Sequence, residues 1–386
     1  MTEYEQHSNK IATRVYLVAF AMILISITIG LLLIVEANTK IIIYPNQEEF
    51  DGLPHDAQCP CTQLSIPYGS FLNVQVRFHQ VCSSDLISNR WINAIFENLY
   101  HNRSYYVADF RSIGSGHFQV LRSLCQLSNR YFNDSLQSLY SRSFVSSKAL
   151  DRNTLQSTID GYMEDFQLNI PLIFKSRIEL IKQFTFSNQL IPALDSTIYI
   201  VLRKLTEEVN YIQLSTSIRS TANDDGSFCA CVYSYDCREQ SGIFYLNTSS
   251  IQSVRSDQLL LPMKNFYAGC TSLNALLQST LEYFYNQTLL NQLLNYFPAN
   301  HQNFPALSIS NNTQFSMNST IQSIINKLML EELSYNISHQ NFYAQCKPYI
   351  CTYIKVERHQ FYYILTTIIG LLGGLTLTLQ ILIPSI

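Results

Sequence analysis

The stretch Phe361–Ile383, FYYILTTIIGLLGGLTLTLQILI, decides how the rest of the chain is interpreted. It contains no Asp, Glu, Lys or Arg. As an α-helix rising about 1.5 Å per residue it extends about 34 Å, enough to cross the hydrocarbon core of a bilayer. A soluble core helix of this length normally carries a polar face, and this one has none. We therefore predict a transmembrane helix over 361–383, with 384–386 as the cytoplasmic end.

A second uncharged apolar stretch, Val15–Val35, lies near the start of the chain. Lys10 and Arg14 precede it, and this placement favours a cytoplasmic N-terminus over 1–14. The competing interpretation is a cleaved signal peptide, with Val35 and Ala37 as small residues before the cut. Apolar cores of signal peptides run over about 7–15 residues, so the longer stretch here favours an uncleaved transmembrane helix.

Between these two stretches lie residues 36–360, which we expect to form one large extracellular domain. The chain has 386 residues, a net charge of −3 and 14% charged residues, fewer than the roughly 25% of a soluble domain. Neither the net charge nor any basic run indicates a nucleic-acid partner.

All ten cysteines fall in this middle region, which predicts disulfides in an oxidising compartment. Seven Asn-x-Ser/Thr sequences are candidate glycosylation sites. The disulfide candidates are Cys59, Cys61, Cys82, Cys125, Cys229, Cys231, Cys237, Cys270, Cys346 and Cys351. The glycosylation candidates are Asn102, Asn133, Asn247, Asn286, Asn311, Asn318 and Asn336.

Apolar periodicity sets the expected secondary structure. Alternation predicts a strand over 72–78. Two short strands around a turn are expected within 228–246, and the Tyr- and Ile-rich segment 346–357 is expected to be a strand. Residues 36–58 are expected to be a connector. Spacings of three and four predict helices over 121–140, 155–166 (ending before Pro171), 191–212, 273–284, 290–297 and 321–328. The predicted class is an α+β membrane protein, with two transmembrane helices flanking a disulfide-bonded extracellular domain that has a membrane-proximal sheet and inserted helices.

The familiar catalytic and phosphate-binding motifs are absent from the sequence, so we do not expect an enzyme or a cofactor. Gly114-Ser115-Gly116 beside His117 lacks the spacing of a nucleophile elbow and is interpreted as a loop. His55, Cys59, Cys61, His79 and Cys82 have some spacing typical of zinc ligands, but extracellular cysteines favour disulfides, so no metal is predicted. Cys59–Cys61 and Cys229–Cys231 are too close in sequence to bridge easily, and each cysteine is expected to reach a more distant partner.

The glycines of the last apolar stretch allow two interpretations. Gly370 and Gly374 form G-x-x-x-G, a spacing that lets another helix approach closely. Alternatively, small residues and threonine hydroxyls can line a pore, and a carbonyl freed at a glycine can bind an ion. The candidate pore or helix-packing residues are Gly370, Gly373, Gly374, Leu375 and Thr376.

The run 370–376, GLLGGLT, resembles the second transmembrane segment of the degenerin/epithelial sodium channel family, which includes acid-sensing channels. That segment has a Gly, three residues, and then Gly-Ala-Ser. The two apolar stretches and the cysteine-bearing middle also resemble this family. The resemblance implies a trimeric cation channel with Gly374-Leu375-Thr376 at the selectivity filter.

The chain also departs from the family pattern. The His-Gly pair before the first transmembrane helix is missing, since Ser8 follows His7. The acidic residue after the filter is replaced by Leu382, with Gln380 nearby, and Leu375 stands where a small residue is usual.

The leading hypothesis is a two-pass plasma-membrane glycoprotein with both termini cytoplasmic. It resembles a homo- or heterotrimeric, ligand- or stimulus-gated channel for monovalent cations such as sodium. Its partners would be the bilayer and an unidentified extracellular ligand. The alternative is a cell-surface binding or adhesion glycoprotein that conducts nothing.

Overall fold

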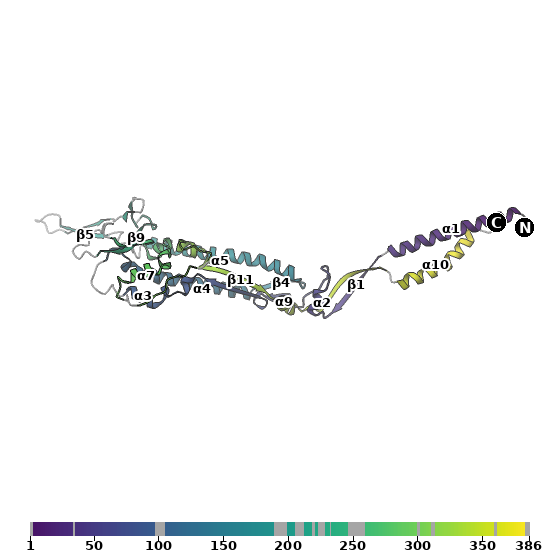
Figure 1. Ribbon diagram of the computed structural model, residues 1–386, viewed down its shortest axis with the longest axis horizontal. Coiled ribbons are helices and arrows are strands. Elements are labelled where there is room, and N and C mark those ends of the chain that lie inside the picture. Colours follow the sequence, from purple (N-terminus) through teal and green to yellow (C-terminus); the bar gives the residue numbers. More distant parts are fainter. Residues whose placement is uncertain are drawn as a thin grey trace. The chain divides into compact units, whose positions relative to one another are not determined.

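The structure is a computed structural model (Figure 1). It describes residues 3–33, 35–96, 105–188, 199–204, 212–217, 221–222, 228–231, 233–245, 259–298, 302–309, 313–358 and 361–382. The chain forms two compact units. We call the first, residues 1–66, 144–155 and 339–386, the terminal unit. We call the second, residues 67–143 and 156–338, the central unit.

The terminal unit brings together both ends of the chain. Its two long apolar helices contact each other, and each is joined to one strand of a ribbon. Its main elements are α1 (Glu3–Leu33), β1 (Val35–Ile43), α2 (Gln47–Asp51), α9 (His339–Cys346), β12 (Ile350–Arg358) and α10 (Phe361–Leu382). Two short strands, β2 (Ser65–Pro67) and β4 (Ser143–Val145), pair near its boundary.

The ribbon is an antiparallel pair of nine-residue strands, β1 and β12. Its register runs without interruption from Val35 opposite Arg358 to Ile43 opposite Ile350. β-Branched residues are common in both strands, which suits a pleated backbone. The strand predicted over 346–357 is confirmed as β12. The expectation of a connector over 36–58 was wrong for residues 36–43, which lie in β1, and Val35 belongs to β1 as well, not to the predicted transmembrane helix.

Two disulfides and an aromatic cluster hold the base of the ribbon. Cys59 is bonded to Cys351, and Cys61 to Cys346. Phe50 of α2 packs against Tyr343 of α9, with ring centroids 5.0 Å apart. The Tyr343 hydroxyl donates to the carbonyl of Pro45 at 2.7 Å. The segments that follow β1 and precede β12 are therefore both covalently linked and packed together.

The described part of the central unit mixes helices with four antiparallel strand pairs: β3 with β11, β5 with β6, β7 with β8, and β9 with β10. Its helices are α3 (Asn89–Phe96), α4 (Phe110–Ser141), most of α5 (Arg152–Asn188), α6 (Ser272–Gln278), α7 (Gln287–Leu294) and α8 (Ile321–Ile325). Its strands are β3 (Leu72–Phe78), β5 (Tyr199–Lys204), β6 (Ile212–Ser217), β7 (Thr221–Ala222), β8 (Phe228–Cys229), β9 (Arg238–Phe244), β10 (Leu259–Gly269) and β11 (Leu330–Ile337).

Aromatic rings make up the centre of this unit. Six large side chains from five segments are at least 98% buried and pack mainly edge to face, the geometry that aromatic pairs favour. They are Trp91, Phe110, Phe118, Phe266, Phe284 and Phe304. α4 enters this cluster at its N-terminus, where Asp109 caps the helix by accepting from the Arg111 amide. The abundance of Phe in the sequence thus has a structural use.

The helix predicted over 191–212 was wrong where the structure describes it. Tyr199–Lys204 and Ile212–Ser217 are strands β5 and β6, paired with each other, while 191–198 and 205–211 lie outside the described residues. The run 198–202 is apolar at almost every position, so spacings of three or four appear by coincidence alongside spacings of two. Periodicity alone cannot distinguish helix from strand in such a run.

Three other expectations also need correction. α5 continues through Pro171 instead of ending before it, because buried Phe174 and Ile178 extend its apolar side beyond the proline. The segment 114–117 lies inside α4, not in a loop. The two strands found in 228–246 do not pair with each other: β8 pairs with β7, and β9 pairs with β10.

The structure confirms a mixed α+β fold with disulfides. Among the described residues, α1 is the one helix that is long and apolar enough to cross a membrane, over Thr13–Gly30. A signal sequence near an N-terminus has the same properties. The apolar run found in α10, Leu365–Gly374, is shorter. The second transmembrane helix and the two-pass arrangement therefore stay predictions.

Candidate functional site: the glycine side of α10

The predicted pore or packing residues lie on one unbroken helix. α10 runs from Phe361 to Leu382 without interruption at Gly370, Gly373 or Gly374, so no backbone carbonyl is released at the glycines. A Cβ atom built on any of these three glycines would meet no heavy atom within 4 Å. The glycines therefore leave open space beside α10, although α10 also contacts α1.

Helical geometry divides the predicted residues between two sides of α10. At about 100° per residue, positions 370 and 374 lie about 40° apart, and position 373 lies about 60° to the other side of 370. Position 376 lies about 200° from 374, and position 375 about 100° from it. In a continuous helix, Thr376 therefore cannot share one face with Gly374. Thr378 follows Gly374 by four residues, so its position is on the glycine side.

Hydroxyl groups in both apolar helices donate to their own backbone. Thr366 Oγ1 lies 3.0 Å from the carbonyl oxygen of Tyr362, and Thr367 Oγ1 lies 2.7 Å from that of Tyr363. In α1, Ser26 and Thr28 bond in the same way to Met22 and Leu24. Such bonds satisfy hydroxyl groups inside an apolar helix without water, and this suits a lipid environment.

All ten cysteines are paired, as the sequence predicts. Besides the two bridges of the terminal unit, the central unit contains Cys82–Cys125, Cys229–Cys237 and Cys231–Cys270. Each member of the closely spaced pairs Cys59/Cys61 and Cys229/Cys231 has a different partner, as expected. Since Cys59, Cys61 and Cys82 are all bonded, the zinc alternative loses its thiolate ligands.

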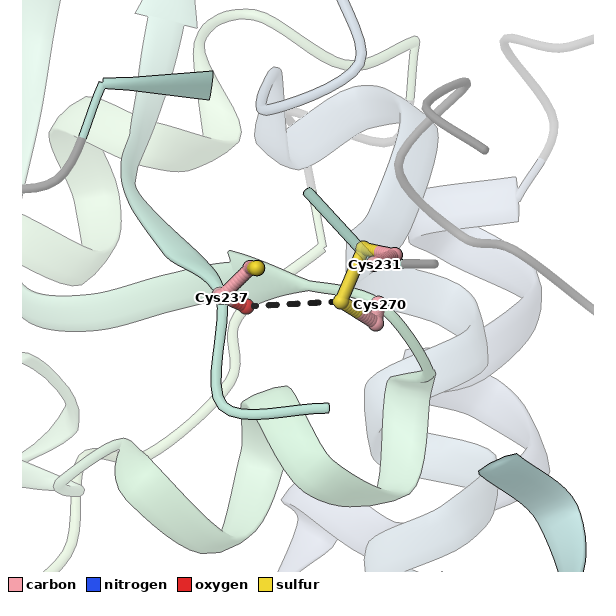
Figure 2. Close-up of side chains that lie close together, drawn as sticks. All are labelled: Cys231, Cys237 and Cys270. Carbon is pink, nitrogen blue, oxygen red and sulfur yellow. Dashed lines mark hydrogen bonds between the residues drawn. A yellow bond between two sulfur atoms is a disulfide. The ribbon is translucent and has the colours of Figure 1, made fainter. Parts of the chain in front are cut away.

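A second group of cysteines lies as close together as metal ligands do, but its sulfur atoms are not free to bind a metal. The sulfur atoms of Cys231, Cys237 and Cys270 lie within 4.8 Å of one another and are buried. Figure 2 shows Cys231 bonded to Cys270, with Cys237 beside them. Cys237 is itself bonded to Cys229. Because metal binding requires free thiolates, these three cysteines are not a metal centre in the oxidised protein.

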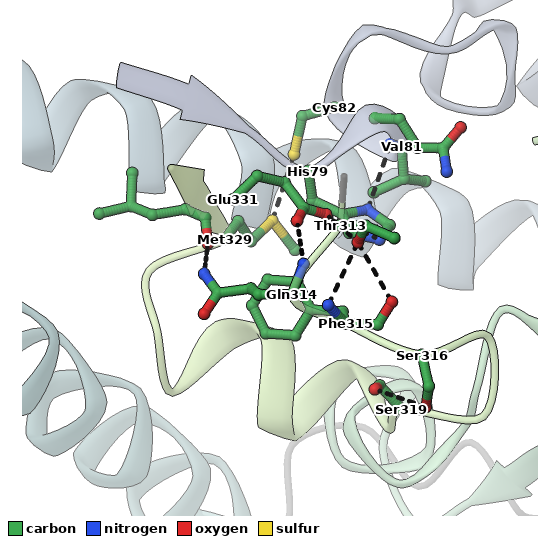
Figure 3. Close-up of polar contacts among 12 residues, drawn as sticks. His79, Val81, Cys82, Thr313, Gln314, Phe315, Ser316, Ser319, Met329 and Glu331 are labelled. Carbon is green, nitrogen blue, oxygen red and sulfur yellow. Dashed lines mark hydrogen bonds and ion pairs between the residues drawn. The ribbon is translucent and has the colours of Figure 1, made fainter. Parts of the chain in front are cut away.

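The structure also contains a buried ionisable pair that the sequence did not reveal. His79 follows β3 and Glu331 lies in β11, with side chains 1% and 2% exposed (Figure 3). His79 Nδ1 accepts from the Val81 amide at 3.2 Å, so the proton of the neutral ring is on Nε2. Nε2 lies 3.8 Å from Glu331 Oε1 and 3.4 Å from the Tyr285 hydroxyl.

Glu331 is surrounded by donors from a neighbouring segment. Thr313 Oγ1 lies 2.9 Å from Oε1, and the Gln314 amide donates to Oε2 at 2.9 Å. Burial lowers the pKa of His79, although the Glu331 carboxylate opposes that shift. The pair is closed to solvent, so it holds segment 313–315 against the β3–β11 sheet and offers no access to a substrate in this conformation.

His117 is a second buried histidine. It lies inside α4, with Nδ1 3.0 Å from the Ile113 carbonyl oxygen and Nε2 3.1 Å from the Tyr267 carbonyl oxygen. Complete burial lowers its pKa to about 4, against the opposing effect of these backbone contacts. One turn before His117, Gly114 lies against the Phe110 ring. A Cβ at position 114 would come within 2.8 Å of that ring, so the close contact requires glycine. The Gly-Ser-Gly-His sequence thus serves helix packing.

Four of the predicted glycosylation sites lie in the described residues, and all four are exposed: Asn133, Asn286, Asn318 and Asn336. Asn286 also caps α7, where its side-chain oxygen accepts from the Thr288 and Leu289 amides. Asn102, Asn247 and Asn311 lie outside the described residues.

Compared with family models, curated proteins and solved structures, the chain matches none of them. The resemblance to the degenerin/epithelial sodium channel family therefore depends on the sequence features alone.

Proposed function

We propose that this protein is a two-pass surface protein that assembles from several copies, a trimer on the family resemblance, and passes monovalent cations between its α10 helices. The observation that carries this proposal is the open space beside Gly370, Gly373 and Gly374 on a continuous apolar helix. Three small residues on one side of a membrane helix suit either a close neighbour or a water-filled axis. The proposed pore side contains Gly370, Gly374 and the position of Thr378.

The position of Thr376 distinguishes two forms of this pore. In the helical form, Thr378 shares a side with Gly374 and supplies the hydroxyl. In the family-like form, the backbone unwinds at the glycines, and Gly374, Leu375 and Thr376 together form the filter. Thr378→Ala should change ion preference in the first form, and Thr376→Ala should change it in the second. Reversal potentials in sodium and potassium solutions separate these two forms.

The second candidate function is a non-conducting surface protein whose α10 glycines serve helix packing alone. The G-x-x-x-G spacing of Gly370 and Gly374 favours it, because that spacing is typical of close helix pairs. The missing acidic residue after the filter position also favours it. In this function the extracellular region would bind a partner, and α10 would hold the copies together.

One experiment separates the two functions. Gly374→Leu fills the glycine side, and Gly30→Leu adds the same bulk to α1, where a Cβ also meets nothing within 4 Å. For a channel, we expect Gly374→Leu to end the current while surface level and subunit count stay unchanged, and Gly30→Leu to conduct. For packing alone, Gly374→Leu should reduce the subunit count. Absence of current from surface-delivered wild type under acid, peptide and mechanical stimulation would reject the channel.

A further inference from the structure

The β1–β12 ribbon has two chemically different faces. Directly opposed residues of an antiparallel pair share a face, and the faces alternate along each strand. The face that contains Val35 has seven apolar residues at its ten positions. Its members are Val35, Ala37, Thr39, Ile41 and Ile43 on β1, and Ile350, Thr352, Ile354, Val356 and Arg358 on β12. We call this set the apolar ribbon face.

The apolar ribbon face is open to solvent in the single chain. Five of its large side chains each expose more than half of their surface, from 53% to 61%. They are Val35, Ile41, Ile43, Ile354 and Val356. A contiguous apolar patch of this kind is unusual on a monomer and marks an interaction surface.

The opposite face is polar and partly covered by the chain itself. Its charged residues include Glu357, which pairs with Lys355 at 2.6 Å and approaches Lys40 at 3.9 Å. Cys351, also on this side, is buried and bonded to Cys59. Backbone bonds between Gln58 and Thr352 add the neighbouring segment to the edge of β12. The apolar face is therefore the side without a cover among the described residues.

An isolated two-stranded ribbon is marginally stable in water, so the apolar ribbon face requires a cover. Lipid is a poor candidate. The described residues provide no third strand beside β1, so its outer backbone groups would lack hydrogen-bond partners in hydrocarbon. Arg358 is the one charged residue among the ten positions of the apolar ribbon face, and a single basic residue gives only a weak attraction to anionic headgroups.

A second copy of the chain can cover the apolar ribbon face and still leave the outer backbone groups of β1 in water. The ribbon joins α1 and α10 directly, so assembly of those helices would bring ribbons from different copies together. Apolar, nearly uncharged faces from several copies can meet around a shared symmetry axis, while the polar face keeps access to water. We propose that the apolar ribbon face is the contact between subunits next to the membrane. This inference rests on the proposed function for the presence of several copies, and it does not require that they conduct.

Cysteine cross-linking in intact membranes tests the contact. Because all native cysteines are bonded, Ile41→Cys or Ile354→Cys adds a single free thiol on the apolar ribbon face. Lys40→Cys and Lys355→Cys, each one residue away, are matched controls on the polar face. Under mild oxidation, we expect covalent dimers at least tenfold more abundant for the apolar-face variants, expressed singly or together, than for the controls. Surface biotinylation confirms that each variant is delivered.

A polarity probe identifies the cover independently. A thiol-reactive fluorophore at Ile41→Cys should report an apolar environment that spin-labelled lipids do not quench. Quenching by those lipids without cross-linking would overturn the inference in favour of lipid. A water-like spectrum, or equal cross-linking from both faces, would overturn it as well. Current is recorded separately from wild type, so loss of the channel hypothesis and loss of the ribbon contact are distinguishable.

Discussion

The Nε2 atom of His79 lies 3.8 Å from the Oε1 atom of Glu331, and both side chains are almost completely buried. Ion pairs on the surface contribute little to stability, whereas removal of one partner from a buried pair leaves polar groups without hydrogen bonds. Glu331 and its neighbour Glu332 show this difference within one strand. Glu331 faces the interior, whereas Glu332 pairs with exposed Arg77 at 3.3 Å.

We expect Glu331→Ala to lower the free energy of unfolding by about 1–3 kcal/mol, because the Gln314 amide and the Thr313 hydroxyl lose their acceptor. Glu332→Ala is the control and should cost less than about 1 kcal/mol. Chemical unfolding of the detergent-purified full chain, followed by the fluorescence of Trp91, measures both variants. Equal effects would contradict the assigned role of Glu331.

His117 should make stability dependent on pH. Its pKa falls from an ordinary value near 6.5 to about 4 in the folded protein, so folding favours the neutral ring. Its contribution is complete above about pH 6.5 and is lost as pH falls toward 4, by no more than about 3 kcal/mol. His117→Gln should flatten this part of the stability profile. His55→Gln, at a side chain 92% exposed, is the control and should change the profile less than His117→Gln.

The paired cysteines predict that no free thiols exist in the mature protein. Thiol counting after denaturation without reductant should find essentially none, and a count of two or more would contradict the assigned pairing. Replacing Cys82 and Cys125 together with serine removes one bridge. It should cost about 2–5 kcal/mol and reduce surface delivery.

The proposed topology predicts that glycosidase treatment lowers the apparent mass of protein made in cells. Asn133, Asn286, Asn318 and Asn336 are the exposed candidate sites. If these four carry the glycans, replacing them with glutamine should remove most of the change in apparent mass. An N-terminal tag should be inaccessible in intact cells and accessible after permeabilisation. Surface labelling of that tag, or loss of residues 1–37 from the mature chain, would show that α1 is not an uncleaved anchor.

Local patterns predicted the elements in which one periodicity dominates. The alternation from Leu72 to Phe78 matches β3, and the spacing of leucines after Leu121 lies within α4. The oxidised state of the cysteines was also predictable, because all ten share one region. The prediction was wrong at 191–212, where a dense apolar run satisfies two periods at once.

Contacts between residues far apart in the chain could not be predicted, because local sequence patterns carry no information about distant partners. The His79–Glu331 contact joins residues 252 positions apart, and nothing near either residue indicates the partner. The apolar ribbon face was missed because the expected connector at 36–58 concealed β1, whose facing residues lie more than three hundred positions away. The side of α10 on which each predicted residue lies needed only the helix period once the helix was known to be unbroken.

The bridges Cys59–Cys351 and Cys61–Cys346 also set an order of events during biosynthesis. The partners are 292 and 285 residues apart, so neither bridge can close until the segment 346–351 has been synthesised. At about 5–20 residues per second, this leaves α1 without its covalent link to the α10 end for roughly 15–60 s. During that interval the central unit can form its own three bridges. Closure of the terminal unit is therefore a late step, and a chain truncated before Cys346 could not complete it.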